Sequence, residues 1–442
     1  MGQNSLGWLG IARLGLVQTS LGSIVVLTTT TINRVMVVEL SMMAIIPGLL
    51  VAWHYALQVL RPRWGHGSDN GGKRTPWIIG GMATLAAGGL LAAVSVWLAA
   101  HIFWAGLALS AIAFTLIGIG VGAAGTSLLV LLAETVVPER RGAAATVVWT
   151  MMIGGFILTT VLAGKFLDPF SMQRLVVIAA AVVGIAFVLS SAAVWGIEAK
   201  YAKRQTPKPN AEKVAFGQAL KDVWADLDAR RFAIFVFISM VAYSAQELII
   251  DPFAGFIFGY TPGQSTSLSG AQHSGALLGM IFVGVASSFA GKAKAMALRN
   301  WTVFGCIASA LALSGLVGAA VVGASWPLKP NVFALGFANG MFAVAAIGSM
   351  FSAAAGQTSR EGIRMGLFGA SQAIAFAAGG FLGTVTADIL KFFTQSNSAS
   401  YGTVFGLEAA LFIVSAVLAL RIGSTQRSQT KPMVLTAQHE MA

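Results

Sequence analysis

Charged residues and cysteine are both scarce in this chain of 442 residues. Lys, Arg, Asp and Glu make up only 10% of it, whereas a soluble globular protein carries about 25% charged residues. Hydrophobic residues reach 56%, so the chain has too few polar side chains to cover its own surface in water. A single cysteine, Cys306, excludes an intrachain disulfide. The composition therefore predicts a polytopic membrane protein and argues against redox chemistry.

Long apolar runs are the dominant feature of the chain. A membrane-spanning helix needs about 20 apolar residues, and the first run is too long for the core of a cleaved signal peptide, so it predicts an uncleaved span. On the length criterion we expect twelve spans: Leu14–Val38, Met43–Leu60, Pro76–Ala100, Ile102–Ala133, Ala143–Leu167, Gln173–Trp195, Phe232–Phe258, Gly270–Ala290, Trp301–Val322, Val332–Phe351, Gly366–Leu390 and Gly402–Leu420.

The basic residues predict the orientation. If both termini are cytoplasmic, the outward segments contain only Lys165, Arg174, Lys329 and Lys391, and Arg34 lies within a span. All other Lys and Arg of the 28 in the chain then fall on inward segments, as is typical of cytoplasmic loops. The net charge of +12 then reflects the basic cytoplasmic loops of a protein embedded in a lipid bilayer. We therefore expect the bilayer as a partner and no nucleic acid as one.

The spans fall into two sets of six. A polar segment with two prolines, Lys200–Lys213, precedes a stretch with the apolar spacing of an amphipathic helix. Gly154-Gly155-Phe156 recurs 225 residues later as Gly379-Gly380-Phe381, as expected of duplicated transporter halves. We predict an all-α fold with residues 1–198 and 232–421 as pseudo-symmetric six-helix bundles, 199–231 as cytoplasmic linker and 422–442 as cytoplasmic tail.

The stretch GHGSDNGGKRT, between the second and third spans, contains the start of a phosphate-binding loop. Such a loop needs a preceding strand and a soluble helix after it, which two flanking membrane spans exclude. The pattern Gly65, Asp69, Gly72, Lys73 and Arg74 instead resembles the signature of the major facilitator superfamily. Its glycines allow a tight turn, and Asp69 can cap a helix and pair with a cation during gating.

A second piece of the superfamily pattern follows the fourth span. Glu134 precedes the run PERRG, which contains Arg140 and Arg141. The alternative is that both pieces are ordinary basic turns on the inward side. The two spacings and the internal repeat together favour the signature.

Two longer runs resemble a narrower family. Leu14–Leu40 is similar to the first span of the PucC/LhaA family, and AQELIIDPFAGFIFGYTPGQST (Ala245–Thr266) is similar to its seventh span. Asp251 and Ala254 replace a more usual Glu and Gly. The run Val51–Gly81 looks closest to a subgroup labelled a bacteriochlorophyll synthase chain, a label that concerns association with pigment synthesis.

The resemblance implies a role in photosynthesis. Members of this family occur in phototrophic bacteria and assist light-harvesting complex assembly or bacteriochlorophyll supply. It implies an intracytoplasmic photosynthetic (bacterial inner) membrane, bacteriochlorophyll or a precursor as a non-covalent ligand, and no covalently bound cofactor. The expected protein partners are bacteriochlorophyll synthase and light-harvesting or reaction-centre polypeptides.

Ionisable side chains inside spans are functional candidates by default. Arg34 lies near the outer end of the first span, where it can also simply reach the interface. Glu247 and Asp251 are four residues apart and share one helix face. We predict that Arg34 pairs with one of these acids across the halves and closes the outer side. Asn33 and Gln246 either line a cavity with them or join helices by hydrogen bonds.

His54 is the candidate axial ligand for the magnesium of a bacteriochlorophyll. We place it within the second span between Trp53 and Tyr55, whose rings could pack on a macrocycle, with Gln58 one turn further. His273 we expect near the outer surface, at the start of the eighth span. The alternative for His54 is a core histidine that is hydrogen-bonded inside the bundle.

No catalytic triad, metal-binding cluster or paired Asp-rich diphosphate motif is present in the sequence. We therefore expect no catalytic or metal site and no intrinsic synthase activity. Two functions remain: a non-catalytic factor that handles or delivers bacteriochlorophyll, or a proton-coupled secondary transporter with Glu247 or Asp251 as the coupling carboxylate. The residues alone favour transport, and the family resemblance favours pigment handling.

Overall fold

A computed structural model describes residues 5–60, 73–201, 225, 227–289, 294–354 and 361–421. Every regular element within these ranges is helical. Three predicted residues of the signature loop, Gly65, Asp69 and Gly72, lie outside the described residues. Most of the predicted linker and the whole predicted tail, 422–442, lie outside them as well.

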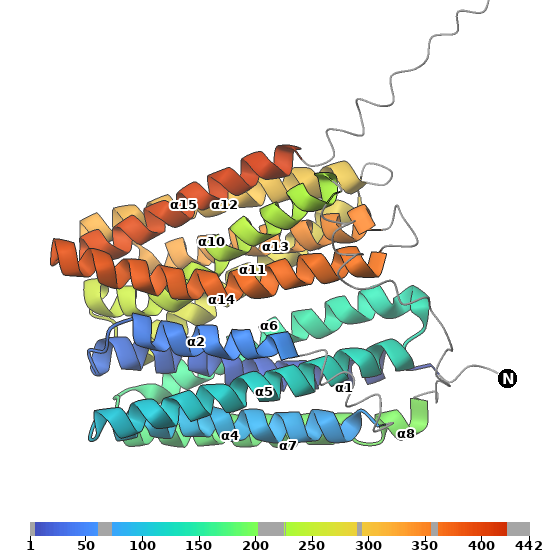
Figure 1. Cartoon of the computed structure of the whole chain (residues 1–442), viewed down its shortest axis with the longest axis horizontal. Helices are drawn as coiled ribbons and strands as arrows, with labels where there is room; N and C mark the ends of the chain where they lie inside the picture. The colour runs from blue at the N-terminus through green and yellow to red at the C-terminus, as the bar shows by residue number, and fades with distance from the viewer. Residues whose placement is uncertain are drawn as a thin grey trace, which may run out of the picture.

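Within the described residues, the N-terminal half, blue to green in Figure 1, contains five long helices, the shorter α2 and the short α8. The first helix continues from α1 through two π-helical segments, η1 and η2. The elements are α1 Trp8–Leu27, η1 Thr28–Ile32, η2 Val35–Glu39, α2 Ile45–Leu57, η3 Gln58–Leu60, α4 Thr75–Ala99, α5 Phe103–Thr135, η4 Pro138–Arg140, α6 Arg141–Leu167, α7 Met172–Val194 and α8 Ile197–Tyr201.

Over its described residues, the C-terminal half, yellow-green to red in Figure 1, repeats the plan with six long helices. Its elements are α10 Leu227–Phe258, α11 Pro262–Ser288, α12 Lys294–Val322, η6 Gly323–Ser325, α13 Leu328–Ala354, α14 Glu361–Thr394 and α15 Asn397–Arg421. Each half has its own apolar core, one formed by residues from Leu6 to Ile197 with Leu248, the other by residues from Phe232 to Ala419.

The helices match the predicted spans in number and order. Eleven of the described helices are long and apolar enough to cross a membrane, and the shorter α2 occupies the place of the predicted second span. The eighth span begins earlier than predicted, at Pro262. Thr261 and Gln264 form a capping box there, which fixes the start of a helix. The early start places His273 well inside α11, so the predicted position near the outer surface is wrong.

The halves meet along two helix pairs, α2 with α14 and α6 with α11. The second pair approaches closely because glycine leaves no side chain between the helices. A Cβ atom on Gly164 would lie 2.8 Å from the carbonyl oxygen of Gly263. Figure 1 shows the two bundles side by side with these pairs along their boundary.

Candidate functional site between the two halves

The candidate site lies where the first helix meets the C-terminal half. We call the end of the bundle that holds Leu40, Asp168 and Gln395 the outer end, because the loop charges predict that it faces outward. Near this end the first helix is π-helical, over Thr28–Ile32 and Val35–Glu39. Threonine hydroxyls bond back to its own carbonyls there, for example Thr30 Oγ1 to Val26 at 2.7 Å. Such widened turns are frequent at functional sites.

Arg34 is buried, with 2% of its surface exposed, between these two segments. Its Nη1 donates to Glu39 Oε1 at 2.5 Å, and its Nη2 donates to the carbonyl oxygen of Tyr260 in the C-terminal half, also at 2.5 Å. The predicted salt bridge of Arg34 with Glu247 or Asp251 is therefore wrong in this conformation. Because Glu39 lies one turn beyond Arg34 on the same helix, it satisfies the guanidinium locally. Arg34 does connect the two halves, but through a hydrogen bond to the Tyr260 carbonyl oxygen and not through an ion pair.

The two predicted acids have other partners. Both carboxylate oxygens of Asp251 lie 2.8 Å from the Ser269 hydroxyl, which donates to them, and the Arg34 charge acts on Asp251 only through space. Glu247 interacts with the Tyr243 hydroxyl one turn earlier on α10. The two acids thus belong to the C-terminal half and do not form the cross-half ion pair.

Two further polar side chains of the first helix reach the C-terminal half. Asn33 Nδ2 donates to the carbonyl oxygen of Leu248 at 2.8 Å, and the Thr31 and Thr266 hydroxyls are 3.0 Å apart. Asn33 therefore joins helices across the boundary, which is one of its two predicted roles. Gln246 is fully buried in α10 and has no contact described with Arg34 or Asn33.

Two aspartates form reciprocal contacts across the halves at the outer end. Asp388 of α14 accepts from the backbone N–H of Ile45, the first residue of α2, at 2.7 Å. Asp168, at the end of α6, accepts from the Thr261 hydroxyl at 2.5 Å and from the N–H of Gly263 in α11 at 3.2 Å. Each half thus caps a helix of the other, and carboxylates are favoured at helix N-termini. We call these two caps the outer latch.

The outer latch was missed by sequence reasoning. Each aspartate lies at or near the end of an outward-running span, where an isolated acid looks like an ordinary surface residue. A usable signal was present, since both follow the repeated Gly-Gly-Phe segments by a short interval on equivalent spans. The arrangement makes the structure a conformation closed at the outer end.

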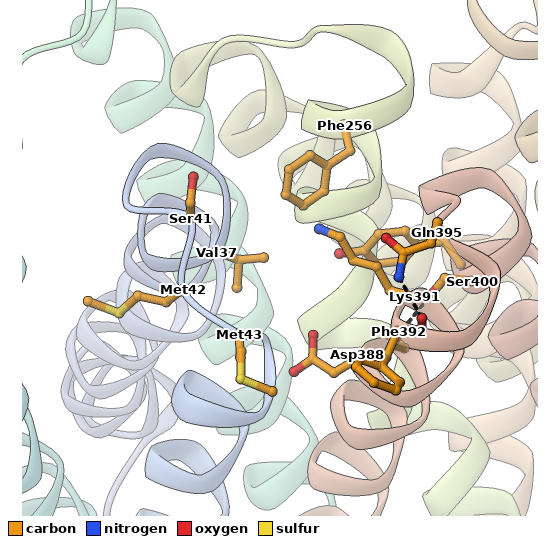
Figure 2. Close-up of a pocket in the computed structure, with 12 residues that line it drawn as sticks. Val37, Ser41, Met42, Met43, Phe256, Asp388, Lys391, Phe392, Gln395 and Ser400 are labelled. Atoms are coloured by element: carbon orange, nitrogen blue, oxygen red, sulfur yellow. Dashed lines mark hydrogen bonds between the residues drawn. The ribbon is translucent and has the colours of Figure 1, made fainter.

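A small cavity lies beside the Asp388 cap, between the α1–α2 connection and the C-terminal half (Figure 2). Its volume is about 340 Å³, and the ammonium of Lys391 lies 4.7 Å from the centre of the Phe256 ring. None of the predicted site residues lines it. The lining residues are Val37, Ser41, Met42, Met43, Phe256, Ala387, Asp388, Lys391, Phe392, Gln395, Ser400 and Tyr401.

The predicted pigment-binding residues point in different directions. His54 is buried, and its Nδ1 lies 2.7 Å from the carbonyl oxygen of Val51. Trp53 is half exposed and donates from Nε1 to Thr115 Oγ1 of α5 at 2.9 Å. That the Trp53 and Tyr55 rings could pack on a macrocycle stays a prediction. The Tyr55 ring remains near, with 4.1 Å between ring centres, and Gln58 follows, largely buried, in η3.

Aromatic contacts lead from His54 across the boundary. The Tyr55 ring lies 5.6 Å from that of Phe376 on α14, and the Phe376 ring lies 5.7 Å from that of Tyr243 on α10. On the other helix pair, the His273 ring of α11 lies 5.0 Å from the Phe156 ring of α6. His273 is thus a second histidine at the boundary. The sequence placed it at the surface because the eighth span was predicted to begin at Gly270, whereas α11 begins at Pro262.

The described part of the signature region forms a polar cluster within the N-terminal half. Arg74 forms a salt bridge with Glu134, with Nη2 and Oε1 2.8 Å apart. Glu198 of α8 accepts from the backbone N–H groups of Arg74 and of Thr75, the latter at 2.8 Å. Lys73 is exposed. Glu198 was not among the predicted residues, although it is an isolated acid next to a predicted inward loop.

The second signature piece begins α6. Arg140 ends the short helix η4, and Arg141 Nε donates to the carbonyl oxygen of Val136 at 3.3 Å. These contacts close the turn between α5 and α6. Among the described residues, no group of three or more His, Cys, Asp or Glu side chains could hold a metal ion.

Comparisons with known proteins identify the family to which this chain belongs. The family model described as PUCC protein matches residues 31–427. The chain is 49% identical to the "Bacteriochlorophyll synthase 44.5 kDa chain" of Rhodobacter capsulatus over 98% of this chain and 100% of that protein. It is 26% identical to "Protein PucC" of the same organism, over 93% of this chain and 91% of that protein.

The solved structures confirm the predicted fold. The nucleoside transporter NupG superposes with a TM-score of 0.65 over 93% of this chain and 98% of its own, at 14% sequence identity. At that identity the likeness concerns the fold alone, two bundles of six helices. The chain therefore has the major facilitator fold and belongs to the PucC protein family.

Proposed function

We propose that this protein is a non-catalytic membrane factor that handles bacteriochlorophyll or its precursors. The observation that supports this most strongly is its identity of 49% over full length with a protein named as a bacteriochlorophyll synthase chain. In this proposal it passes pigment toward the synthase and toward nascent light-harvesting or reaction-centre polypeptides. It does so in the inner, photosynthetic membrane, with both termini in the cytoplasm as the loop charges predict.

The chemistry of His54 suits a pigment ligand. When Nδ1 donates to the Val51 carbonyl, the lone pair lies on Nε2; in metal-binding histidines the nitrogen that does not bind the metal usually donates to a carbonyl or carboxylate in this way. The magnesium of a bound bacteriochlorophyll accepts such a lone pair. His273, with its ring against Phe156, is the comparable histidine on the other helix pair.

Space at His54 is limited in this conformation. The side chain has only 1% of its surface exposed, and the ring packs against Tyr55. The outer cavity, about 340 Å³, is at the lower end of the range for drug-sized ligands, and a bacteriochlorophyll is larger. In this proposal pigment enters laterally from the bilayer when α2 separates from α14, where the ring of Tyr55, the neighbour of His54, contacts Phe376.

The test is an absorption spectrum with pigment extraction from protein solubilised mildly from a phototrophic membrane. We expect stoichiometric bacteriochlorophyll in the parent protein, its loss in His54→Leu and its retention in His273→Leu. Equal retention in both variants would remove His54 from the proposal. An intact parent protein without pigment would refute pigment handling.

A second function, proton-coupled transport of a small molecule, has one observation in its favour. Asp251 is buried in α10 beside the boundary and interacts through space with Arg34, and ionisable groups at such positions often serve proton relays. Under this alternative, uptake into proteoliposomes should follow an imposed proton gradient, and Glu247→Gln or Asp251→Asn should abolish it.

A further inference from the structure

A buried carboxyl group in the last helix has no role in the functions above. Glu408 of α15 is 2% exposed, and neither of its carboxylate oxygens has a hydrogen-bond partner among the described residues. An unpaired charge in such a place is costly. The side chain therefore has to be neutralised by a bound proton or by a bound cation.

The neighbouring aromatic contacts show where Glu408 points. The Phe405 ring lies 5.0 Å from the Phe253 ring of α10, and the Phe412 ring lies 5.8 Å from the Phe342 ring of α13. Glu408 is three residues after Phe405 and four before Phe412, so the three side chains share one face of α15. The carboxyl group is therefore directed into the interior of the C-terminal half, toward α10 and α13.

Asn339 of α13 lies at nearly the same depth. It is three residues before Phe342, while Glu408 is four residues before Phe412, and both helices run inward from the outer end. With a rise of about 1.5 Å per residue, the two residues differ in depth by roughly 2 Å. Asn339 Oδ1 accepts from Ser309 Oγ of α12 at 2.9 Å, which leaves the buried Nδ2 without a partner.

Gln246 of α10 completes the set. It is seven residues before Phe253 and thus on the same face, about 6 Å deeper than Glu408 along the helices. Its surface is 0% exposed, and neither atom of its amide has a hydrogen-bond partner among the described residues. We call Glu408, Asn339 and Gln246 the inner polar site of the C-terminal half.

The unpartnered atoms complement one another. The site offers donors, Asn339 Nδ2 and Gln246 Nε2, and acceptors, the Glu408 oxygens and Gln246 Oε1, yet they do not bond to one another. Buried polar groups of this kind are bridged by ordered water, which makes about three hydrogen bonds. Glu408 and Asn339 at nearly the same depth, with Gln246 about 6 Å deeper, supply the partners that a short chain of such water needs.

The other titratable groups on the surrounding helices do not provide a counter-charge. Asp251 of α10 is bonded to Ser269, and Asp388 of α14 caps α2. Cys306 of α12 is buried and uncharged as a thiol, and Tyr401 of α15 packs against Phe253. Within the described residues, Glu408 takes part in no salt bridge with Lys or Arg, so a proton is the simplest neutralising species.

We propose that the inner polar site is a hydrated proton-binding site, with Glu408 as the group that carries the proton. Binding converts the carboxylate to a carboxylic acid, and release returns the proton to the bridging water as hydronium. The donors Asn339 and Gln246 orient that water. The site lies inside the C-terminal half and away from His54, so it does not depend on pigment binding.

Infrared difference spectroscopy of the purified full chain tests this directly. At neutral pH the parent protein should show a C=O stretching band of a protonated carboxylic acid that Glu408→Gln lacks and Glu408→Asp shifts. Transfer to D2O should shift the same band, because water reaches the site. The matched variant Glu247→Gln should retain that component.

Three outcomes would overturn the proposal. An unchanged carboxylic acid region in Glu408→Gln would mean that Glu408 is ionised. Loss of the band when Na⁺ replaces K⁺ in the parent protein would assign a cation site instead. A band that does not move in D2O would mean a dry carboxylic acid. If Glu408→Gln does not fold, the band shift in Glu408→Asp and the D2O response of the parent protein decide the question.

Discussion

Removal of one carboxylate of the outer latch should open the outer end while both halves stay folded. Asp388→Ala removes the acceptor for the Ile45 N–H, and Asp168→Ala removes the acceptor for Thr261 and Gly263. Each substitution acts on a contact that exists only when the halves are together at this end. The separate cores of the two halves are not touched.

The size of the effect follows from the capping contacts. Loss of a helix N-cap costs about 0.5–2 kcal/mol, and the interaction of a carboxylate with the helix dipole is included in that range at an exposed end. A loss of about 1–2 kcal/mol changes a two-state ratio by roughly 5- to 30-fold. Because Asp168 and Asp388 share no partner, their separate factors should multiply in the double variant.

A cysteine at Val37 reports the opening. Val37 lines the outer cavity but is only 3% exposed, so Val37→Cys should react slowly with a membrane-impermeant maleimide until the latch opens. Cys306 is buried, and protein without the new cysteine gives the background. Labelling should accelerate roughly 5- to 30-fold in the Asp388→Ala background.

The matched control is Glu198→Ala. Glu198 also caps a helix N-terminus through backbone N–H groups, but donor and acceptor both lie within the N-terminal half. Its loss should leave Val37→Cys labelling unchanged. Equal acceleration by Glu198→Ala, or no acceleration by Asp388→Ala, would refute the latch as the element that holds the outer end closed.

Two further predictions concern packing and the signature region. Gly336→Ala should lower the free energy of unfolding by about 1–3 kcal/mol, because its Cβ would lie 2.0 Å from the carbonyl oxygen of Gln272. The control is Gly184→Ala, whose Cβ would meet nothing within 4 Å. Thermal unfolding in detergent measures both variants. Arg74→Ala should lower the unfolding temperature because it leaves its salt-bridge partner Glu134 unpaired, and exposed Lys73→Ala should not.

The helices were predictable because membrane spans are encoded locally. An apolar run of sufficient length forms a helix whatever surrounds it, and the described helices accordingly appear where the runs are. Boundaries with polar content were less accurate. The first turns of α11 contain serine, threonine and glutamine, and only the cap at Thr261 reveals that the helix begins at Pro262.

The side-chain partners were not predictable because they depend on helix rotation and on the register between the halves. Arg34 was correctly identified as a residue that bonds across the boundary, but its acceptor is a backbone carbonyl, which carries no sequence signal. Glu39 was available as a neighbour one turn away. Glu408 is a different case, because it could have been found from the sequence. Glu247 was chosen because ionisable side chains inside spans are functional candidates, and Glu408 meets the same criterion in the last span.

The outer latch and the two histidines, His54 and His273, lie on the same helix pairs. Asp388 of α14 caps α2, and α2 also contains His54 and the Tyr55 ring that packs on α14. Asp168 of α6 contacts α11, and α11 contains His273, whose ring packs on α6. Each pair is therefore joined twice, by a cap at the outer end and by an aromatic contact deeper in the bundle.

This double attachment links access to the histidines with the state of the outer end. The two contacts of a pair lie on the same rigid helices, so separation of α2 from α14 has to break the Asp388 cap and the contact of Tyr55 with Phe376 together. A flat molecule that enters from the bilayer at the α2–α14 boundary would replace the aromatic contact with its own ring surface, which offsets part of that cost. A small polar solute offers no such replacement. The proposed pigment handling therefore predicts that this boundary accepts a large aromatic ligand more readily than a hydrophilic one.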